Sequence, residues 1–162
     1  MYGRGSRIMV ARSVFMGNTK RVQSQIAKSL ASKEAIAKAM AISVEMVRTS
    51  AIESIMRGSK TGTTYTKYNP RRTHTASAEG EAPASDTGNL VSGITTNIEK
   101  SITGDIVGEV IANARDGKGG NYAKHLEFGT REMRPRPFLF PALEKNKKRI
   151  LAIFRKHGVR FR

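Results

Sequence analysis

The period of the hydrophobic pattern changes along the chain. Residues 7–15 alternate with a period of two, which predicts a short strand. The segment MGNTK then predicts a turn, with Asn18 or Thr19 as the N-cap of a helix. From about residue 19 to residue 57, apolar residues recur every three or four positions. This spacing predicts one amphipathic helix, or two helices broken near ASKEA, ended by Gly58.

The predicted helix has two apolar stripes, which suit a core or a subunit interface. They are Val22, Ile26 and Leu30, followed by Ala37, Met40, Val44, Val47, Ala51 and Ile55. Residues 58–88 are rich in Gly, Pro, Ser and Thr, and predict a long loop that Tyr65 and Tyr68 anchor. We expect this loop to become ordered against something, with Asp86 or Thr87 capping a short helix over GNLVSGI.

A hairpin and a last helix complete the pattern. Residues 95–102 and 106–112 predict two strands joined by a tight turn at 103–105. The segment YAKHLEF is expected to bury Tyr122, Leu126 and Phe128. Proline is tolerated only in the first turn of a helix, so Pro141 places the N-cap of the last helix near Phe138. The apolar stripe of this helix is Phe140, Leu143, Ile150, Leu151 and Phe154, and its end is marked by His157 with Gly158.

Charge is unevenly distributed over a chain of single-domain length, residues 1–162. The net charge of +16 divides into +11 for residues 1–78, −5 for residues 79–116 and +10 for residues 117–162. A folded protein with this balance needs acidic neighbours, either nucleic acid or protein. No apolar run has the length of a membrane span, so we expect no membrane partner. Without cysteine, disulfides and thiol catalysis are excluded.

We find no catalytic constellation in the sequence. His74, His125 and His157 are isolated, without metal-ligand spacing. A structural role is favoured for His125, although Glu127 is near it in the sequence. We therefore expect no enzymatic activity, no metal and no cofactor.

Two separated motifs carry a resemblance to a known family. The segment 122–142 resembles the C-terminal signature of the head–tail joining, or tail-completion, proteins of long-tailed double-stranded DNA bacteriophages, in which a Leu-Glu-Phe-Gly-Thr run precedes an Arg-Pro-Phe-Leu-x-Pro-Ala run. The matching positions are Tyr122, Ala123, Leu126, Glu127, Phe128, Gly129, Thr130, Met133, Arg136, Pro137, Phe138, Leu139, Pro141 and Ala142. A second block of the same family matches at Ala76, Ser77, Gly80, Glu81, Pro83, Ala84, Asp86, Thr87, Gly88 and Leu90.

The resemblance implies a small α+β subunit that assembles as a ring in the phage neck. With the elements above, the expected fold is a small antiparallel sheet packed by a long N-terminal helix and a C-terminal helix, with a long loop. The implied partners are other copies of the chain, the head connector or stopper proteins, and the tail terminator or tail tube proteins. The N-terminal strand and long helix match the family only in type, and the basic balance departs from it.

The long loop 58–88 and the C-terminal motif supply the candidate interface residues. They are Tyr65, Tyr68, Glu79, Glu81, Pro83, Asp86, Glu127, Phe128, Gly129, Thr130, Arg134, Arg136, Pro137 and Phe138. Two interpretations of Glu127, Arg134 and Arg136 stay open: contacts between subunits, or caps of turns within one subunit. The acidic middle of the chain against its basic flanks suits head-to-tail docking, because such contacts close into rings. The alternative functions are a tail terminator or minor tail protein, and a basic nucleic-acid-binding protein that contacts passing DNA non-specifically.

Overall fold

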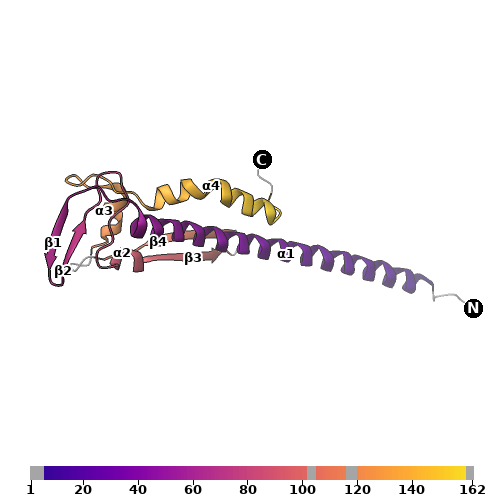
Figure 1. Ribbon diagram of the computed structural model, residues 1–162. Helices are drawn as coiled ribbons and strands as arrows, with labels where there is room; N and C mark the ends of the chain where they lie inside the picture. Colours follow the sequence, from indigo (N-terminus) through magenta and orange to yellow (C-terminus); the bar gives the residue numbers. More distant parts are fainter. Residues whose placement is uncertain (1–5, 102–104, 116–119, 160–162) are drawn as a thin grey trace, which may run out of the picture.

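One uninterrupted helix forms the N-terminal third of the protein. The computed structural model describes residues 6–101, 105–115 and 120–159, with the side chains of the first helix at 22–28, 30 and from 32 onward. Helix α1 spans Ser6–Arg57, and its outer part extends well beyond the rest of the molecule (Figure 1). It ends where the Gly58 N–H donates to the Ser54 carbonyl at 3.2 Å, as predicted.

The predicted strand over residues 7–15 is therefore wrong, and so is the turn that was predicted to follow it. A helix pairs its backbone groups within itself, whereas a strand needs a neighbouring strand. Residues 7–15 have no strand to pair with among the described residues, so the short alternation does not decide the structure. A single glycine such as Gly17 costs a helix only about 1 kcal/mol.

The segment 58–88 holds a hairpin that the loop prediction missed. Strands β1, Thr64–Tyr68, and β2, Arg71–Thr75, pair antiparallel, with Lys67 opposite Arg72. Threonine and tyrosine favour strands, and Asn69-Pro70 supplies the turn between them. The remainder of the segment, from Ala76 to Gly88, has no helix or strand.

The second hairpin was predicted closely. Helix α2, Asn89–Ser92, leads into strand β3, Ile94–Lys100, which pairs antiparallel with β4, Ile106–Ala112. Part of the predicted turn lies outside the described residues. The residue before α2 is Gly88, at φ +78°, and no side chain caps this helix, so the predicted cap by Asp86 or Thr87 is wrong.

Two helices close the chain. Helix α3 spans Tyr122–Phe128 and helix α4 spans Leu139–Lys156, with Phe138 at its N-cap and His157 at its C-cap, as predicted. In α3, however, Ala123 and Glu127 are the buried residues, while Tyr122 and Leu126 are only half-buried. Phe128 is 76% exposed, so the expectation that it is buried is wrong.

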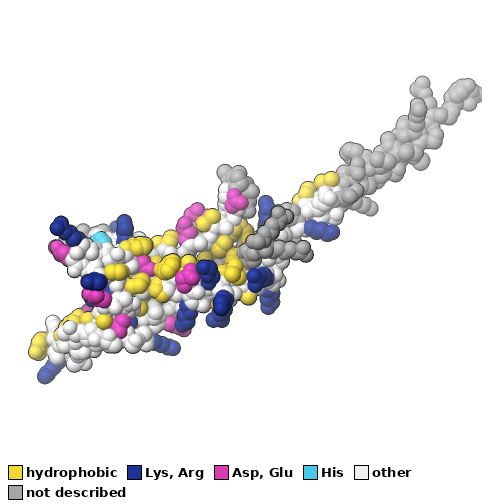
Figure 2. Space-filling model, turned by 90° about the horizontal axis from the view of Figure 1, so that it is seen from above, with side chains coloured by type: hydrophobic (Ala, Val, Ile, Leu, Met, Phe, Trp, Pro, Cys, Tyr) yellow, Lys and Arg dark blue, Asp and Glu magenta, His cyan; other side chains and the backbone are white. Residues whose placement is uncertain are grey.

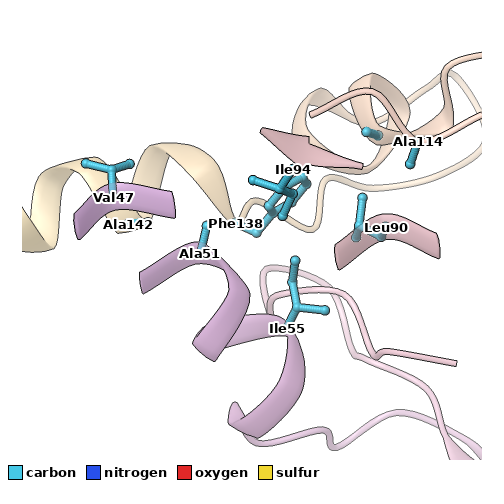
Figure 3. Close-up of a cluster of buried hydrophobic side chains, with 9 residues drawn as sticks. Val47, Ala51, Ile55, Leu90, Ile94, Ala114, Phe138 and Ala142 are labelled. Atoms are coloured by element: carbon cyan, nitrogen blue, oxygen red, sulfur yellow. The ribbon is translucent and has the colours of Figure 1, made fainter. Parts of the chain in front are cut away.

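The core lies where α1, β3 and the start of α4 meet (Figure 3). The largest fully buried side chains are Phe138, Ile55 and Ile94, from three different elements. The Nε of Arg48 donates to the Ile94 carbonyl at 2.9 Å, which ties α1 to β3. The predicted α+β class is confirmed, with a long N-terminal helix, a C-terminal helix and small antiparallel hairpins. The C-terminal helix α4 packs mainly on α1, which also contacts β3 and β4, so the expected packing of both helices on one sheet holds for α1. The strands form two separate two-stranded sheets.

Candidate functional site

The side chain of Glu127 holds the start of helix α4. Its carboxylate accepts hydrogen bonds from the backbone N–H groups of Phe138 at 2.9 Å, Leu139 at 3.0 Å and Phe140 at 2.9 Å. The first N–H groups of a helix have no partner inside it, and the helix dipole favours a negative charge there. The first turn of α4 has no acidic residue of its own. Glu127, which is buried, supplies that charge from α3.

The turn that follows α3 returns the chain to this cap. Gly129 has φ +76°, and a Cβ there would lie 2.8 Å from the Met133 carbonyl oxygen, so glycine is required. The Thr130 hydroxyl accepts from the N–H groups of Glu132 and Met133 at 3.2 and 3.0 Å. Gly129 is thus the residue at which the chain reverses toward the start of α4.

The two motifs that are far apart in the sequence lie against each other. The Gly80 N–H donates to the Pro135 carbonyl at 3.1 Å, and Glu79 lies 3.6 Å from the Arg134 guanidinium. The Arg136 N–H donates to the Leu126 carbonyl at 2.7 Å, which holds the proline-rich segment on α3. The segment 76–88 and the segment 122–142 therefore form one substructure, which we call the motif platform.

Glu81 and Lys60 fasten this platform to the end of α1. The Glu81 carboxylate accepts from the Thr61 N–H at 3.0 Å, the Thr61 hydroxyl at 2.7 Å and the Ala78 N–H at 2.9 Å. The backbone hydrogen bonds from Thr61 and Ala78 lower the pKa of Glu81. The Lys60 ammonium donates to the Ala82 carbonyl at 2.7 Å and to Ser54 at 3.1 Å, and its partial burial lowers its pKa.

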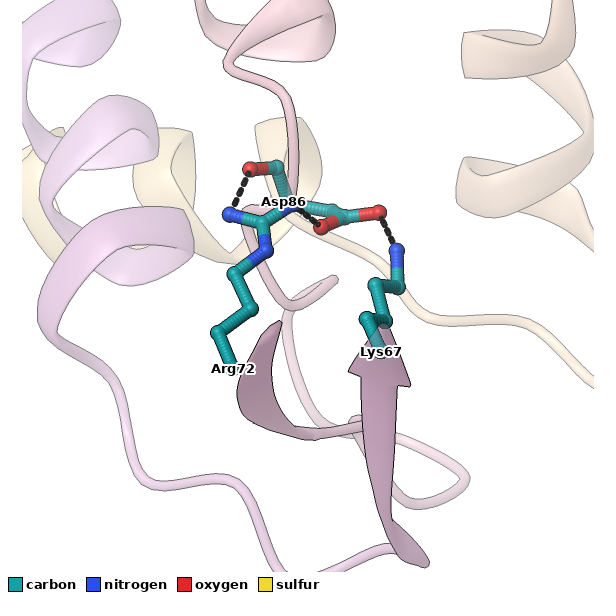
Figure 4. A network of polar contacts seen from close by, with 3 residues as sticks. All are labelled: Lys67, Arg72 and Asp86. Carbon is teal, nitrogen blue, oxygen red and sulfur yellow. Dashed lines mark hydrogen bonds and ion pairs between the residues drawn. The ribbon is translucent and has the colours of Figure 1, made fainter. Parts of the chain in front are cut away.

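Asp86 joins the platform to the first hairpin (Figure 4). Its carboxylate accepts from Lys67 of β1 and from Arg72 of β2, and its carbonyl accepts from Arg72 at 3.3 Å. The hydrogen bond from Lys67 comes first among the causes that lower the pKa of Asp86, and the charges of Lys67 and Arg72 add to it. Lys67 and Arg72 face each other across the strands, so Asp86 also relieves the repulsion between them.

A pocket of about 330 Å³, lined by both polar and apolar side chains, lies at the platform. Its lining includes Asp86 and the buried Pro83 of the segment 76–88. It also includes Tyr122, Leu126 and Arg136 of the segment 122–142. Burial raises the pKa of the Tyr122 hydroxyl, and a hydrogen bond with the Asn89 side chain opposes that effect. The buried Nε of Arg136 has no hydrogen-bond partner among the residues that the structure describes.

Most of the predicted interface residues therefore fall into two groups. Glu81, Asp86, Glu127, Gly129, Thr130 and Phe138 support the fold of their own chain. For Glu127, the contacts within the subunit are shown, and Arg134 has an exposed partner in Glu79. Tyr65, Tyr68 and Phe128 are exposed, with Tyr68 at 81%. Tyr65 packs edge-on against His74, with ring centroids 5.4 Å apart. Pro137 lines the same groove as Phe128, which is described next.

An apolar groove that sequence reasoning missed lies beside the platform. Its volume is about 880 Å³, and α1, β4, α3 and α4 form its walls. Met40 and Val44 of α1, Gly108 of β4, Phe128 of α3, and Phe140 and Leu143 of α4 line it. Figure 2 shows hydrophobic side chains gathered in a band along the body. The alternation along β4 and the stripe on α4 were visible in the sequence, but the space between them was not.

The described residues hold neither a metal site nor a membrane span. No group of three His, Asp or Glu side chains in the described ranges could hold a metal ion. Within the same ranges, no helix is both long enough and apolar enough to cross a membrane.

The fold and the site together define a small α+β protein with a long helical extension, a motif platform and an apolar groove. No protein-family model matches the chain, and no curated protein and no solved structure matches it. Its function is therefore inferred from its own residues and from the motifs that they form.

Proposed function

We propose that this protein is a virion structural protein of the bacteriophage neck, where it forms a ring that completes the tail and joins it to the head connector. In this role it works without catalysis, and it is assembled in the host cytoplasm before it enters the virion. Its partners are other copies of itself, the connector or stopper proteins on one side, and the tail terminator or tail tube proteins on the other.

The observation that carries the proposal is the motif platform. Two motifs that resemble the tail-completion family, separated in sequence by the whole β3–β4 hairpin, meet through the Gly80–Pro135 hydrogen bond. Two blocks of one family signature are expected to form a single substructure, and this contact fits that expectation. Within the platform, Glu127 and Gly129 hold the shape of the proline-rich segment, so these matched residues have a physical role.

Electron microscopy of particles made without the protein tests this function. We expect tails of normal length that fail to join heads. Tails of irregular length would instead assign the protein as a tail terminator. Intact, infectious particles would contradict any neck role.

Reversal of the charge of Glu79 tests the interface itself. The sequence alone suggests reversing both Glu79 and Glu81, but Glu81 holds Thr61 and Ala78 of its own chain, so its loss would disturb the fold. Glu79 is exposed and pairs only with the exposed Arg134 at 3.6 Å among the described residues. We expect Glu79→Lys to leave stability within about 0.5 kcal/mol of the wild type and to weaken assembly. Unchanged ring formation in light scattering would remove Glu79 from the interface.

DNA passing through the ring gives a second test. Exposed basic residues follow one another along α4: Lys145, Lys147, Lys148, Arg149, Arg155 and Lys156. Weak DNA binding that changes little with salt fits the structural role. A steep fall of affinity with salt would favour a nucleic-acid-binding protein, because it reports the release of many counterions.

A further inference from the structure

The outer part of α1 carries an apolar stripe that is exposed in the part of the chain that the structure describes. In residues 22–34, which we call the arm, every described side chain is exposed. Val22, Ile26 and Leu30 are 52%, 53% and 57% exposed. These three large aliphatic side chains lie on one exposed face of the arm. An exposed apolar patch of this kind marks an interaction site.

This stripe continues the buried face of the same helix. A helix has 3.6 residues per turn, so residues 18 positions apart lie directly in line along it. Ile26 is therefore in line with Val44, which is buried on the body. Val22 and Leu30 lie on either side of that line. The face of α1 that packs in the core beyond Ala35 thus runs on unchanged into the arm, where it has no cover.

The groove is the complementary feature on the same chain. It is lined almost entirely by apolar groups, and three of its large side chains, Phe128, Phe140 and Leu143, are 76%, 64% and 45% exposed. Its volume of about 880 Å³ has room for several aliphatic side chains. An amphipathic helix with anchors four residues apart is a regular occupant of such a groove.

The arm cannot reach the groove of its own subunit. Residues 18–57 contain no glycine and no proline, and α1 continues through them as one helix. Because Met40 and Val44 of this same helix form one wall of the groove, the arm points away from it (Figure 1). Folding back would require α1 to break, with loss of its internal hydrogen bonds.

We propose that the arm of one copy docks in the groove of a second copy, with Val22, Ile26 and Leu30 as the anchors. This inference rests on the self-assembly part of the proposed function and names the contact that holds the copies together. The two surfaces differ, so the contact is head-to-tail. Such contacts repeat from copy to copy, and they close into a ring when the rotation between copies allows it.

Cysteine cross-linking of the full chain tests the contact directly. The protein has no cysteine, so single substitutions report one pair of positions without background. Ile26→Cys in one preparation and Leu143→Cys in a second, tagged preparation are mixed under mild oxidation, and we expect a disulfide between them. Lys28→Cys is the matched control, because Lys28 lies on the opposite face of the arm. Equal yields with Lys28→Cys, or no cross-link in either mixture, would overturn the proposal.

Sedimentation measurements of self-association give the second test. We expect Ile26→Glu to weaken self-association at least about tenfold, since a charge would enter an apolar groove. Lys28→Glu should leave it within about threefold, because surface charges contribute little. Ile26 is exposed in the single subunit, so the thermal unfolding of Ile26→Glu should match the wild type and show that the variant is folded.

The outcomes separate this contact from the neck function. A protein that is monomeric at every concentration, or a ring that Ile26→Glu leaves intact, overturns arm docking. Neither result changes what electron microscopy of particles without the protein would show. Conversely, infectious particles without the protein would remove the neck role and leave a positive cross-link standing.

Discussion

The turn after α3 and the arm of α1 differ in what their side chains contact. In the turn, Glu127, Gly129 and Thr130 find their contacts a few residues away or in the adjoining motif. In the arm, Val22 and Ile26 are more than half exposed. The turn is thus held by contacts within one subunit, whereas the apolar stripe of the arm has no cover among the described residues. In our proposal the turn maintains shape and the arm supplies binding energy.

The largest expected effect comes from two phenylalanines of the same motif. Phe138 is fully buried between α1 and β3, while Phe128 is 76% exposed. We expect Phe138→Ala to lower the free energy of unfolding by about 4 kcal/mol, because it leaves a cavity. Phe128→Ala should change it by less than about 1 kcal/mol and should instead weaken self-association. Urea denaturation measures the free energy of unfolding of each variant, and sedimentation measures its self-association. Equal losses of stability in the two variants would contradict different roles for the buried and the exposed phenylalanine.

The second prediction removes the cap of α4. Glu127→Ala leaves three N–H groups without their charged acceptor, so we expect a loss of about 2–3 kcal/mol in the free energy of unfolding. Glu132→Ala, at an exposed position of the same turn, should cost less than about 0.5 kcal/mol. Urea denaturation compares the two. A similar small loss in both would mean that the start of α4 is held by packing of Phe138 and not by the carboxylate.

The third prediction separates backbone conformation from crowding. Gly129 and Gly80 have almost the same φ, +76° and +77°. A Cβ at Gly129 would lie 2.8 Å from the Met133 carbonyl, while nothing lies within 4 Å at Gly80. We expect Gly80→Ala to cost about 1 kcal/mol through conformation alone. Gly129→Ala should cost about 2–3 kcal/mol, since the turn must also shift. Thermal unfolding compares the two variants. Equal losses of stability would show that the turn around Gly129 shifts at no cost to make room for the Cβ.

The smallest expected effect concerns the stability of the fold at acidic pH. The pKa of Asp86 is lowered by the hydrogen bond from Lys67 and by the charges of Lys67 and Arg72. A carboxyl group whose pKa is lower in the folded state stabilises the fold above its unfolded pKa of about 4. That stability is lost as the pH falls through the lowered pKa. We expect Asp86→Asn to reduce the melting temperature at neutral pH and to flatten its decline below about pH 4. Lys67→Met should act in the same direction, and curves parallel to the wild type would contradict the role of this ion pair.

The local sequence pattern predicted those elements whose bounds depend on a few neighbouring residues. The end of α1 at Gly58, the β3–β4 hairpin and the cap at Phe138 each follow from a signal a few residues long, namely a glycine, an alternation or a proline. The strand over residues 7–15 failed because a strand also needs a partner, which local pattern does not reveal. The β1–β2 hairpin was missed although its threonines and tyrosines were visible, because the glycines and prolines around them outweighed a short alternation.

For the candidate site, too, the sequence predicted the local features and the tertiary structure decided the contacts between them. The sequence by itself determined that residues 76–90 and 122–142 are unusual segments, that the last helix begins near Phe138, and that Val22, Ile26 and Leu30 share a face. Only the tertiary structure decided that the two segments touch and that the Glu127 carboxylate caps α4. It also decided that α1, β4 and α4 leave a groove between them. Helical and strand periods arise from the local geometry of the backbone. Contacts across tens of residues depend on how whole elements pack, which no short stretch of sequence specifies.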